Sequence, residues 1–176
     1  MDDRQQRIQS YRQKIISKRP DMISEEPRFF ICNHCHNLVI QEKSSSNQTL
    51  FQCCGQTMNN LSPHSTDEDG KENIPILKFT GGISVQHAAV VEIGEIHPHP
   101  MTRKHHIEWV YLRTAQGGQL KYLTLNQYPQ ITFALSDEDA YAYCNRSVCK
   151  DCVFHCKRGF AAYAYCNKDG LWKVQY

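Results

Sequence analysis

Short apolar runs alternate with polar turns along the second part of the chain, from residue 74 onward. Five runs are rich in the β-branched and aromatic residues that strands favour, namely PILKF (75–79), VQHAAVVEI (85–93), IEWVYLR (107–113), LKYLTL (120–125) and QITFAL (130–135). The segment 116–119, which contains Gly117 and Gly118, has the composition of a hairpin turn. Several strands at such short spacing predict a β-sandwich.

The first part of the chain has a different pattern. Apolar residues recur at helical spacing up to Pro20, at Ile8, Tyr11, Ile15 and Ile16. We expect a short amphipathic helix over 3–19, with a solvated basic arm as the alternative. Residues 29–60 read as short strands and turns, and the polar stretch 62–73 reads as a linker. The expected protein is mainly β, with a helical extension (1–26), a small domain (27–62) and a β-sandwich (73–176).

Composition restricts the class of protein. The formal charge of +2 and the hydrophobic fraction of 40% are ordinary for a globular protein, so we expect no nucleic-acid partner. The chain has no apolar run of roughly 18 residues and its N-terminus has no signal-peptide pattern, which predicts a cytoplasmic protein without a membrane span. The 9 cysteines are unusual. An odd number of cysteines in a reducing compartment favours metal binding over a disulfide framework.

Four of the cysteines form a pattern typical of a metal site near the N-terminus. Cys32 and Cys35 are two residues apart, and the adjacent pair Cys53 and Cys54 follows after residues 36–52. Two thiolates from the first pair and two from the second can surround one ion tetrahedrally. This geometry suits zinc or iron, and the spacing alone does not choose between them.

The sequence around these cysteines resembles a known family. The segments FFICNHCHNLVI and LFQCCGQTMNNL are similar to the N-terminal domain of desulfoferrodoxins, which are superoxide reductases with an extra iron centre. The resemblance continues in HPHPM (97–101), KHHIEW (104–109) and CNKDGLW (166–172), so that it spans roughly residues 29–176. It implies a rubredoxin-like iron held by the four cysteines, and a second iron centre on an immunoglobulin-like β-sandwich.

The family's second centre has four histidines around ferrous iron, an axial cysteine thiolate and one open position. The resemblance assigns His99, His105 and Cys166 to this centre. It places Asp169 and Asn73 where the family has its other two histidines, and Lys71 near the lysine that helps attract superoxide. A mixed site of two histidines, Asp169 and Cys166, with Asn73 as a weak ligand, is one expectation. His87, on the apolar side of its strand, is an alternative ligand, although a buried core histidine is the simpler reading of that position.

The remaining cysteines are clustered in an insert at 144–161 that lies outside the usual family pattern. Four thiols fall within thirteen residues, at Cys144, Cys149, Cys152 and Cys156. This density predicts a third metal site, which could hold an iron–sulfur cluster, a single iron or a structural zinc. Free or disulfide-bonded cysteines are the alternative.

The resemblance implies a superoxide reductase that converts superoxide to hydrogen peroxide with electrons from an external rubredoxin-like or flavin-dependent donor. It also implies a homodimer. Because two of the four histidines are replaced, the alternative is an iron-binding electron-transfer protein that is catalytically weak or inactive on the same scaffold. A purely structural zinc protein is the third hypothesis.

Overall fold

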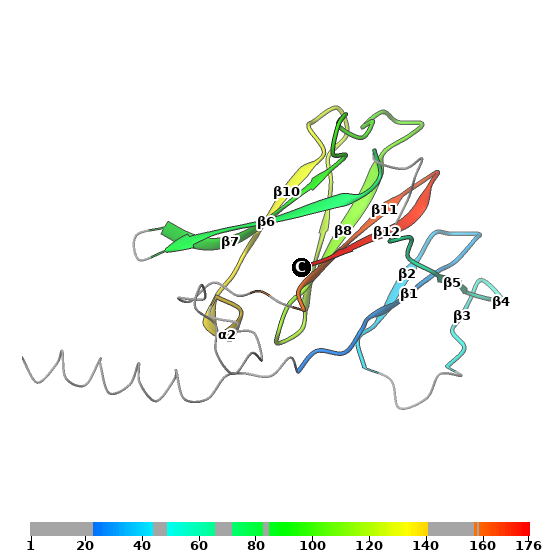
Figure 1. Ribbon diagram of the computed structural model, residues 1–176. Coiled ribbons are helices and arrows are strands. Elements are labelled where there is room, and N and C mark those ends of the chain that lie inside the picture. The colour runs from blue at the N-terminus through cyan, green and yellow to red at the C-terminus, as the bar shows by residue number, and fades with distance from the viewer. Residues whose placement is uncertain (1–22, 44–48, 66–71, 83–84, 141–156, 158) are drawn as a thin grey trace, which may run out of the picture.

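The computed structural model describes residues 23–43, 49–65, 72–82, 85–140, 157 and 159–176, and it is mainly β (Figure 1). The N-terminal unit contains β1 (Arg28–Ile31), β2 (Leu38–Gln41), β3 (Gln52–Cys53), β4 (Gln56–Thr57) and β5 (Asn59–Leu61). The larger unit contains β6 (Pro75–Gly82), β7 (Val85–Ile93), β8 (Ile107–Arg113), β9 (Gly118–Tyr122), β10 (Gln130–Ala134), α2 (Asp137–Ala140), β11 (Ala161–Cys166) and β12 (Gly170–Gln175).

Two antiparallel sheets form the predicted sandwich. One has the order β10-β7-β6 and the other the order β12-β11-β8-β9. Alternate residues of the strands face the space between the sheets, as the period of two requires. Val110 and Leu112 of β8 lie there with Ala162, Ala164 and Cys166 of β11, and all five are fully buried. The end of β11 therefore places Cys166 inside the sandwich core.

A third sheet covers the outer face of the larger sandwich sheet. This sheet has the order β2-β1-β5 and lies beside the strands β11 and β12 (Figure 1). Phe29 of β1 packs against outward-facing side chains of β8 and β11. Phe29 lies 1% exposed between Trp109, Tyr111 and Tyr163, with ring centroids 5.0–5.4 Å apart. The sheet β12-β11-β8-β9 is thus covered on both faces, which explains why five of the six positions from Ile107 to Leu112, Glu108 excepted, are buried.

The predicted linker is in part attached to the sandwich. His64 forms an isolated parallel bridge to Trp172, in which its amide donates to Leu171 O at 2.8 Å and its carbonyl accepts from Lys173 N at 2.8 Å. The rings of His64 and Trp172 are 5.1 Å apart. This backbone pairing holds His64, three residues after β5, against β12.

Glu26 fastens the segment before β1 to the sandwich. Its Oε1 accepts hydrogen bonds from Tyr163 Oη and Lys173 Nζ, both at 2.5 Å, and its Oε2 pairs with Arg113 at 2.9 Å. Arg113 also donates to the carbonyl of Ser24 at 2.6 Å. Burial acts to raise the pKa of Glu26, but the hydrogen bonds from Lys173 and Tyr163 and the nearby cations lower it below its usual value.

We expect Glu26→Gln to lower the free energy of unfolding at pH 7 by up to about 1 kcal/mol, because the carboxylate is half exposed and screened. A carboxyl with a depressed folded pKa stabilises the fold above its unfolded pKa, near 4.3. This contribution fades as the pH falls through the folded pKa, so the difference between the variant and the parent should shrink below about pH 4. Urea unfolding at several pH values measures it. Glu92→Gln, which breaks only the exposed pair with Lys78, is the control. An equal loss of stability in both variants would show that the bonds of Glu26 contribute no more than an exposed ion pair.

The observed strands confirm the mainly β fold, and the five apolar runs predicted from residue 74 onward correspond to β6, β7, β8, β9 and β10. The third of these ends in the predicted hairpin, where Thr114 N donates to Gly117 O. The helix expected at 3–19 and most of the insert at 144–161 lie outside the described residues. In the part of the chain that the structure describes, no helix has the length and apolar character of a membrane span.

Candidate metal centres

The four N-terminal cysteines converge at the ends of β1 and β3. Cys32 follows β1, and Cys35 comes from the turn after it, where the amide of His36 donates to Cys32 O at 2.9 Å. Cys54 and Gly55 both have positive φ, at 51° and 73°, so the tight turn between β3 and β4 brings the adjacent thiols toward one point.

The sulfur positions fit a single tetrahedral ion. Cys53 Sγ lies 3.5 Å from Cys35 Sγ and 3.9 Å from Cys54 Sγ. A disulfide needs about 2.05 Å, so these are not bonded pairs. The edge of a tetrahedron with metal–sulfur bonds of roughly 2.3 Å is about 3.8 Å. The ligand atoms of all four cysteines lie within 4.8 Å of one another, as one iron or zinc ion requires.

The four thiols differ in how readily they ionise. Hydrogen bonds from the backbone amides of Cys35 and His34 lower the pKa of Cys32 to about 6. The hydrogen bond with the Cys35 side chain contributes most to raising the pKa of Cys54 to about 12. A hydrogen bond with the same side chain raises the pKa of Cys53. Only some of the thiols are therefore thiolates at neutral pH, and binding of an ion would release protons from the others.

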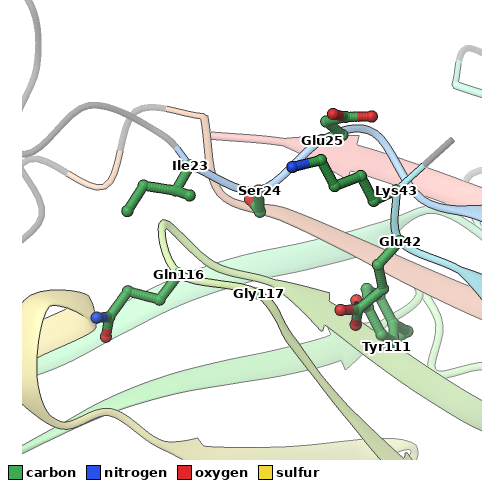
Figure 2. Close-up of a pocket in the computed structure, with 8 residues that line it drawn as sticks. All are labelled: Ile23, Ser24, Glu25, Glu42, Lys43, Tyr111, Gln116 and Gly117. Carbon is green, nitrogen blue, oxygen red and sulfur yellow. Dashed lines mark hydrogen bonds between the residues drawn. The ribbon is translucent and has the colours of Figure 1, made fainter. Parts of the chain in front are cut away.

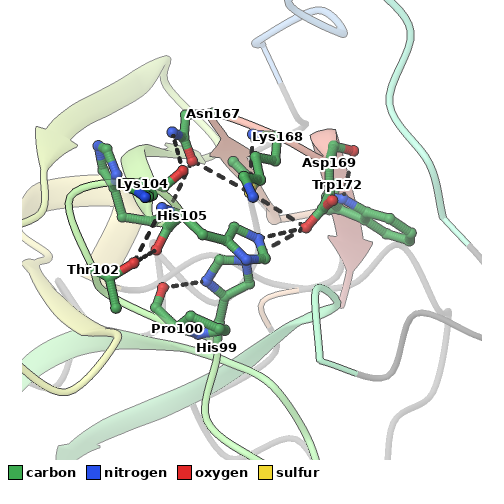
Figure 3. A network of polar contacts seen from close by, with 11 residues as sticks. His99, Pro100, Thr102, Lys104, His105, Asn167, Lys168, Asp169 and Trp172 are labelled. Carbon is green, nitrogen blue, oxygen red and sulfur yellow. Dashed lines mark hydrogen bonds and ion pairs between the residues drawn. The ribbon is translucent and has the colours of Figure 1, made fainter.

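A second group of ligand atoms lies at the end of the sandwich. His99, His105, Cys166 and Asp169 each offer one atom, all within 4.8 Å of one another. His99 belongs to the loop after β7, and its amide donates to Ile93 O at 3.1 Å. His105 comes from the loop before β8, and Cys166 and Asp169 from the turn between β11 and β12. Figure 3 shows the rings of His99 and His105 facing the carboxylate of Asp169.

The distances in this group centre on the carboxylate of Asp169. Its Oδ2 lies 2.7 Å from His105 Nε2, 3.9 Å from His99 Nε2 and 3.5 Å from Cys166 Sγ. Burial acts to raise the pKa of Asp169, but the hydrogen bonds from His105 and Cys166 lower it, so the group is a carboxylate at neutral pH. Two nitrogens, a carboxylate oxygen and a thiolate suit iron or zinc.

The protonation of His99 supports a ligand role. Its side chain is fully buried, and its Nδ1 contacts Pro100 O at 2.6 Å, so Nδ1 carries the proton. Its Nε2 is buried without a hydrogen-bond partner. Burial lowers the pKa of His99, which keeps the ring neutral and leaves the Nε2 lone pair aimed at the group. A buried acceptor without a hydrogen-bond partner is what a metal-binding imidazole nitrogen requires.

Cys166 is fully buried, and burial raises the pKa of its thiol, although the amides of Asp169 and Lys168 act to lower it. Lys168 N lies 3.4 Å from the sulfur. These amides would stabilise the thiolate once an ion displaces its proton. Cys166 therefore has the environment of a structural ligand and is not an exposed reactive thiol.

The other residues considered from the sequence are placed differently. Asn73 precedes β6, and its Oδ1 is buried without a hydrogen-bond partner. Pro75 opposes Ile93, which holds His99, so Asn73 lies at the same end of the sandwich as the site. His87 lies on β7 with its carbonyl bound to Leu135 N, about 20 Å along the strand from Ile93. Lys71 and the four insert cysteines lie outside the described residues.

Asn167 is a supporting residue that the sequence analysis did not single out. Its Nδ2 donates to Lys104 O at 3.1 Å (Figure 3). Its Oδ1 accepts from His106 N at 2.9 Å, and its backbone amide donates to His106 O at 3.1 Å. These three bonds join the loop that carries His105 to the turn that carries Cys166 and Asp169. The only sequence signal is its place directly after Cys166.

We expect Asn167→Ala to weaken ferrous iron binding at this second site by about 10- to 100-fold, because loss of an outer-shell partner misplaces two ligand-bearing segments. The four-cysteine site should keep its affinity. Anaerobic competition with a chelator, read separately for each site by its absorption, measures the change.

Asn37→Ala is the matched control, because Asn37 Nδ2 lies 3.6 Å from Cys53 Sγ and belongs to the other site. Asn37→Ala should weaken iron binding at the four-cysteine site and leave the affinity of the second site unchanged. If Asn167→Ala weakens both sites equally, its effect is general destabilisation and the supporting role is wrong.

Sequence comparisons with known proteins identify relatives of this chain. The sequence model of the desulfoferrodoxin family matches residues 65–175. A desulfoferrodoxin homologue from Methanothermobacter thermautotrophicus is 32% identical over 127 residues, which cover 70% of this chain and 95% of that protein. Desulfoferrodoxin from Nitratidesulfovibrio vulgaris is 27% identical over 144 residues, covering 82% of this chain and 92% of its own.

A solved structure shares the fold. The superoxide reductase from Treponema pallidum superposes with a TM-score of 0.62 at 24% identity, covering 88% of this chain and 100% of that chain. The matched region of the family model begins after the four-cysteine unit and contains all four residues of the second group. With this match over more than half of its length, the chain belongs to the desulfoferrodoxin family.

Proposed function

We propose that this protein is a superoxide reductase-like non-haem iron protein that reduces superoxide to hydrogen peroxide with an electron from an external donor. The observation that carries the proposal is the buried Nε2 of His99, which has no hydrogen-bond partner and faces Asp169, His105 and Cys166. Membership of the desulfoferrodoxin family supports iron as the ion.

The residues of the second site have distinct roles in this proposal. His99 and His105 bind through Nε2, Cys166 through its thiolate and Asp169 through Oδ2. Iron held there would supply the electron and an open position for superoxide. His105 and Asp169 are partly exposed, with 28% and 35% of their side chains accessible, whereas His99 is fully buried. Superoxide would therefore approach from the side of His105 and Asp169. Asn73, with its unpaired Oδ1, is a proposed weak ligand, and Lys71 is proposed to attract the anion.

The four-cysteine site is proposed to hold a rubredoxin-like iron that transfers electrons. A rubredoxin-like protein or a flavin-dependent reductase would reduce it in the cytoplasm, and a homodimer is the proposed assembly. The insert cysteines Cys144, Cys149, Cys152 and Cys156 are proposed to bind a third metal ion or cluster.

A second function is favoured by one specific observation. Asp169 is ionised and lies 2.7 Å from His105, where the family resemblance places an imidazole. An anionic carboxylate beside a thiolate stabilises ferric iron more than a neutral imidazole does. The site would then have a lower reduction potential, and the protein would be an iron-binding electron-transfer protein with weak or no catalysis.

One experiment separates these functions. The anaerobically reduced, iron-loaded protein is mixed with superoxide, and peroxide formation is compared with spontaneous dismutation. Faster formation supports the reductase, and an equal rate contradicts it. Asp169→His and Asp169→Ala are tested beside the parent. If the carboxylate lowers the potential as a ligand, Asp169→His should raise the potential of the second iron, and Asp169→Ala should weaken iron binding.

A further inference from the structure

A continuous stack of aromatic rings leads away from the second site. Tyr165 directly precedes Cys166, and its ring is stacked on Trp109 with centroids 5.3 Å apart and an interplanar angle of 13°. Trp109 is stacked on Phe29 at 5.3 Å. Phe29 then contacts Tyr163 at 5.0 Å and Tyr111 at 5.4 Å. The three tyrosines among these five rings lose an electron at a moderate potential only if a base accepts the phenol proton. Tryptophan can lose an electron without transferring a proton.

The two tyrosines at the far end of the stack each have such a base. Tyr111 Oη donates a hydrogen bond to Glu42 Oε1, and Tyr163 Oη donates to Glu26 Oε1 at 2.5 Å. Both side chains are almost fully buried. Burial, together with the glutamate, raises the pKa of each phenol far above its usual value, so both are protonated in the resting protein. A phenol that loses an electron becomes a strong acid, and the bonded carboxylate takes its proton without any rearrangement.

The two carboxylates differ as proton acceptors. Glu26 is already paired with Lys173 and Arg113, which lower its pKa and make it a weak base. Tyr111 and Glu42 instead line a surface pocket of about 180 Å³ with Ser24, Lys43 and Gly117 (Figure 2). Gly118 is needed for this arrangement, because a Cβ there would lie 1.9 Å from Tyr111 Oη. Tyr111 is therefore the ring of the stack that has a bonded proton acceptor and can be reached by a small molecule from the surface pocket.

We propose that Tyr165, Trp109, Phe29 and Tyr111 form an electron route that protects the second site from oxidation by hydrogen peroxide. This inference rests on the proposed function, since peroxide is its product. Cleavage of the O–O bond of one peroxide consumes two electrons and two solvent protons and gives two waters. Ferrous iron, when held at the second site, would supply one of these electrons. Tyr111 supplies the other along the stack, and its proton moves to Glu42. A small external thiol that enters the pocket would then return a hydrogen atom to the tyrosyl radical and leave as a thiyl radical, and Glu42 would release the proton that it accepted to solvent.

The test adds hydrogen peroxide to the full-length, iron-loaded, reduced protein and follows radicals by freeze-quench EPR and oxidised residues by mass spectrometry. The parent should form a tyrosyl radical, and Tyr111→Phe should lose at least about nine tenths of it. Tyr163→Phe is the matched control and should keep most of it, because the two phenols occupy similar positions against Phe29. Trp109→Phe should slow radical formation by about tenfold or more and raise oxidation of Cys166 to sulfinic or sulfonic acid.

Each outcome decides the matter. Equal radical yield in the parent and Tyr111→Phe, or no radical in the parent with Cys166 oxidation unchanged by Trp109→Phe, overturns the route. Iron content is measured on the same samples. A protein without iron at the second site contradicts the proposed function as well as the route. A protein that binds iron and reduces superoxide but forms no Tyr111 radical contradicts the route alone.

Discussion

Gly94→Ala is expected to remove iron from the second site and to lower the free energy of unfolding by about 2–4 kcal/mol. Gly94 has a φ of +98°, which a residue with a side chain rarely adopts. A Cβ at this position would lie 2.1 Å from His97 O and 2.9 Å from His99 N. Both contacts are with backbone, so the loop after β7 would have to move, and His99 would move with it. Urea unfolding and iron content measured at each site check the two effects.

Alanine substitutions at two other glycines separate backbone strain from steric overlap as causes of the lost stability. Gly55 also has a positive φ, but a Cβ there would meet nothing within 4 Å, so Gly55→Ala measures backbone strain alone, about 1 kcal/mol. Gly117 has open space, and Gly117→Ala should change stability very little. If Gly94→Ala keeps a fully occupied second site, the loop tolerates the displacement and His99 is not held as described.

Cys53→Ser is expected to lower the iron affinity of the four-cysteine site by at least about 100-fold, because it removes a ligand and not merely an outer-shell partner. The Cys53 sulfur has contacts with Cys35, Cys54 and the side chain of Asn37. The visible absorption of a ferric tetrathiolate should disappear, and iron analysis should show that the second site keeps its ion.

Cys166→Ser is the reciprocal variant. It should leave the tetrathiolate absorption unchanged and remove the signal of the second centre. If Cys53→Ser keeps a normal tetrathiolate spectrum, another thiol has replaced it, and the assignment of the four ligands must be revised. If either variant removes both centres, the two sites are not independent in metal binding.

The strands of the sandwich were predictable because short runs rich in β-branched and aromatic residues, separated by turn residues, are typical of strands. The spacing of the four cysteines was equally informative, because few arrangements other than a metal site use it. The resemblance to desulfoferrodoxins assigned His99, His105 and Cys166 to one centre and put Asp169 in the place of a family histidine, and the structure brings the four together.

What the sequence did not reveal depends on contacts between distant segments. The buried run from Ile107 to Leu112 reads as one strand, and nothing in it says that Phe29 covers its second face. The linker reading of His64 relied on polar composition, which cannot report the backbone bridge to Trp172. Asn167 was missed because an asparagine in a turn is common, and its three bonds to the His105 loop exist only in three dimensions.

The double coverage of the sheet β12-β11-β8-β9 restricts how this protein can be divided. The N-terminal unit resembles a detachable module in the sequence, yet Phe29 and its neighbours are the cover for Trp109, Tyr111 and Tyr163. A fragment that begins after the linker would expose this aromatic face to water and to other copies of itself. Exchange of the N-terminal unit for another domain therefore requires a new apolar cover for Trp109, Tyr111 and Tyr163.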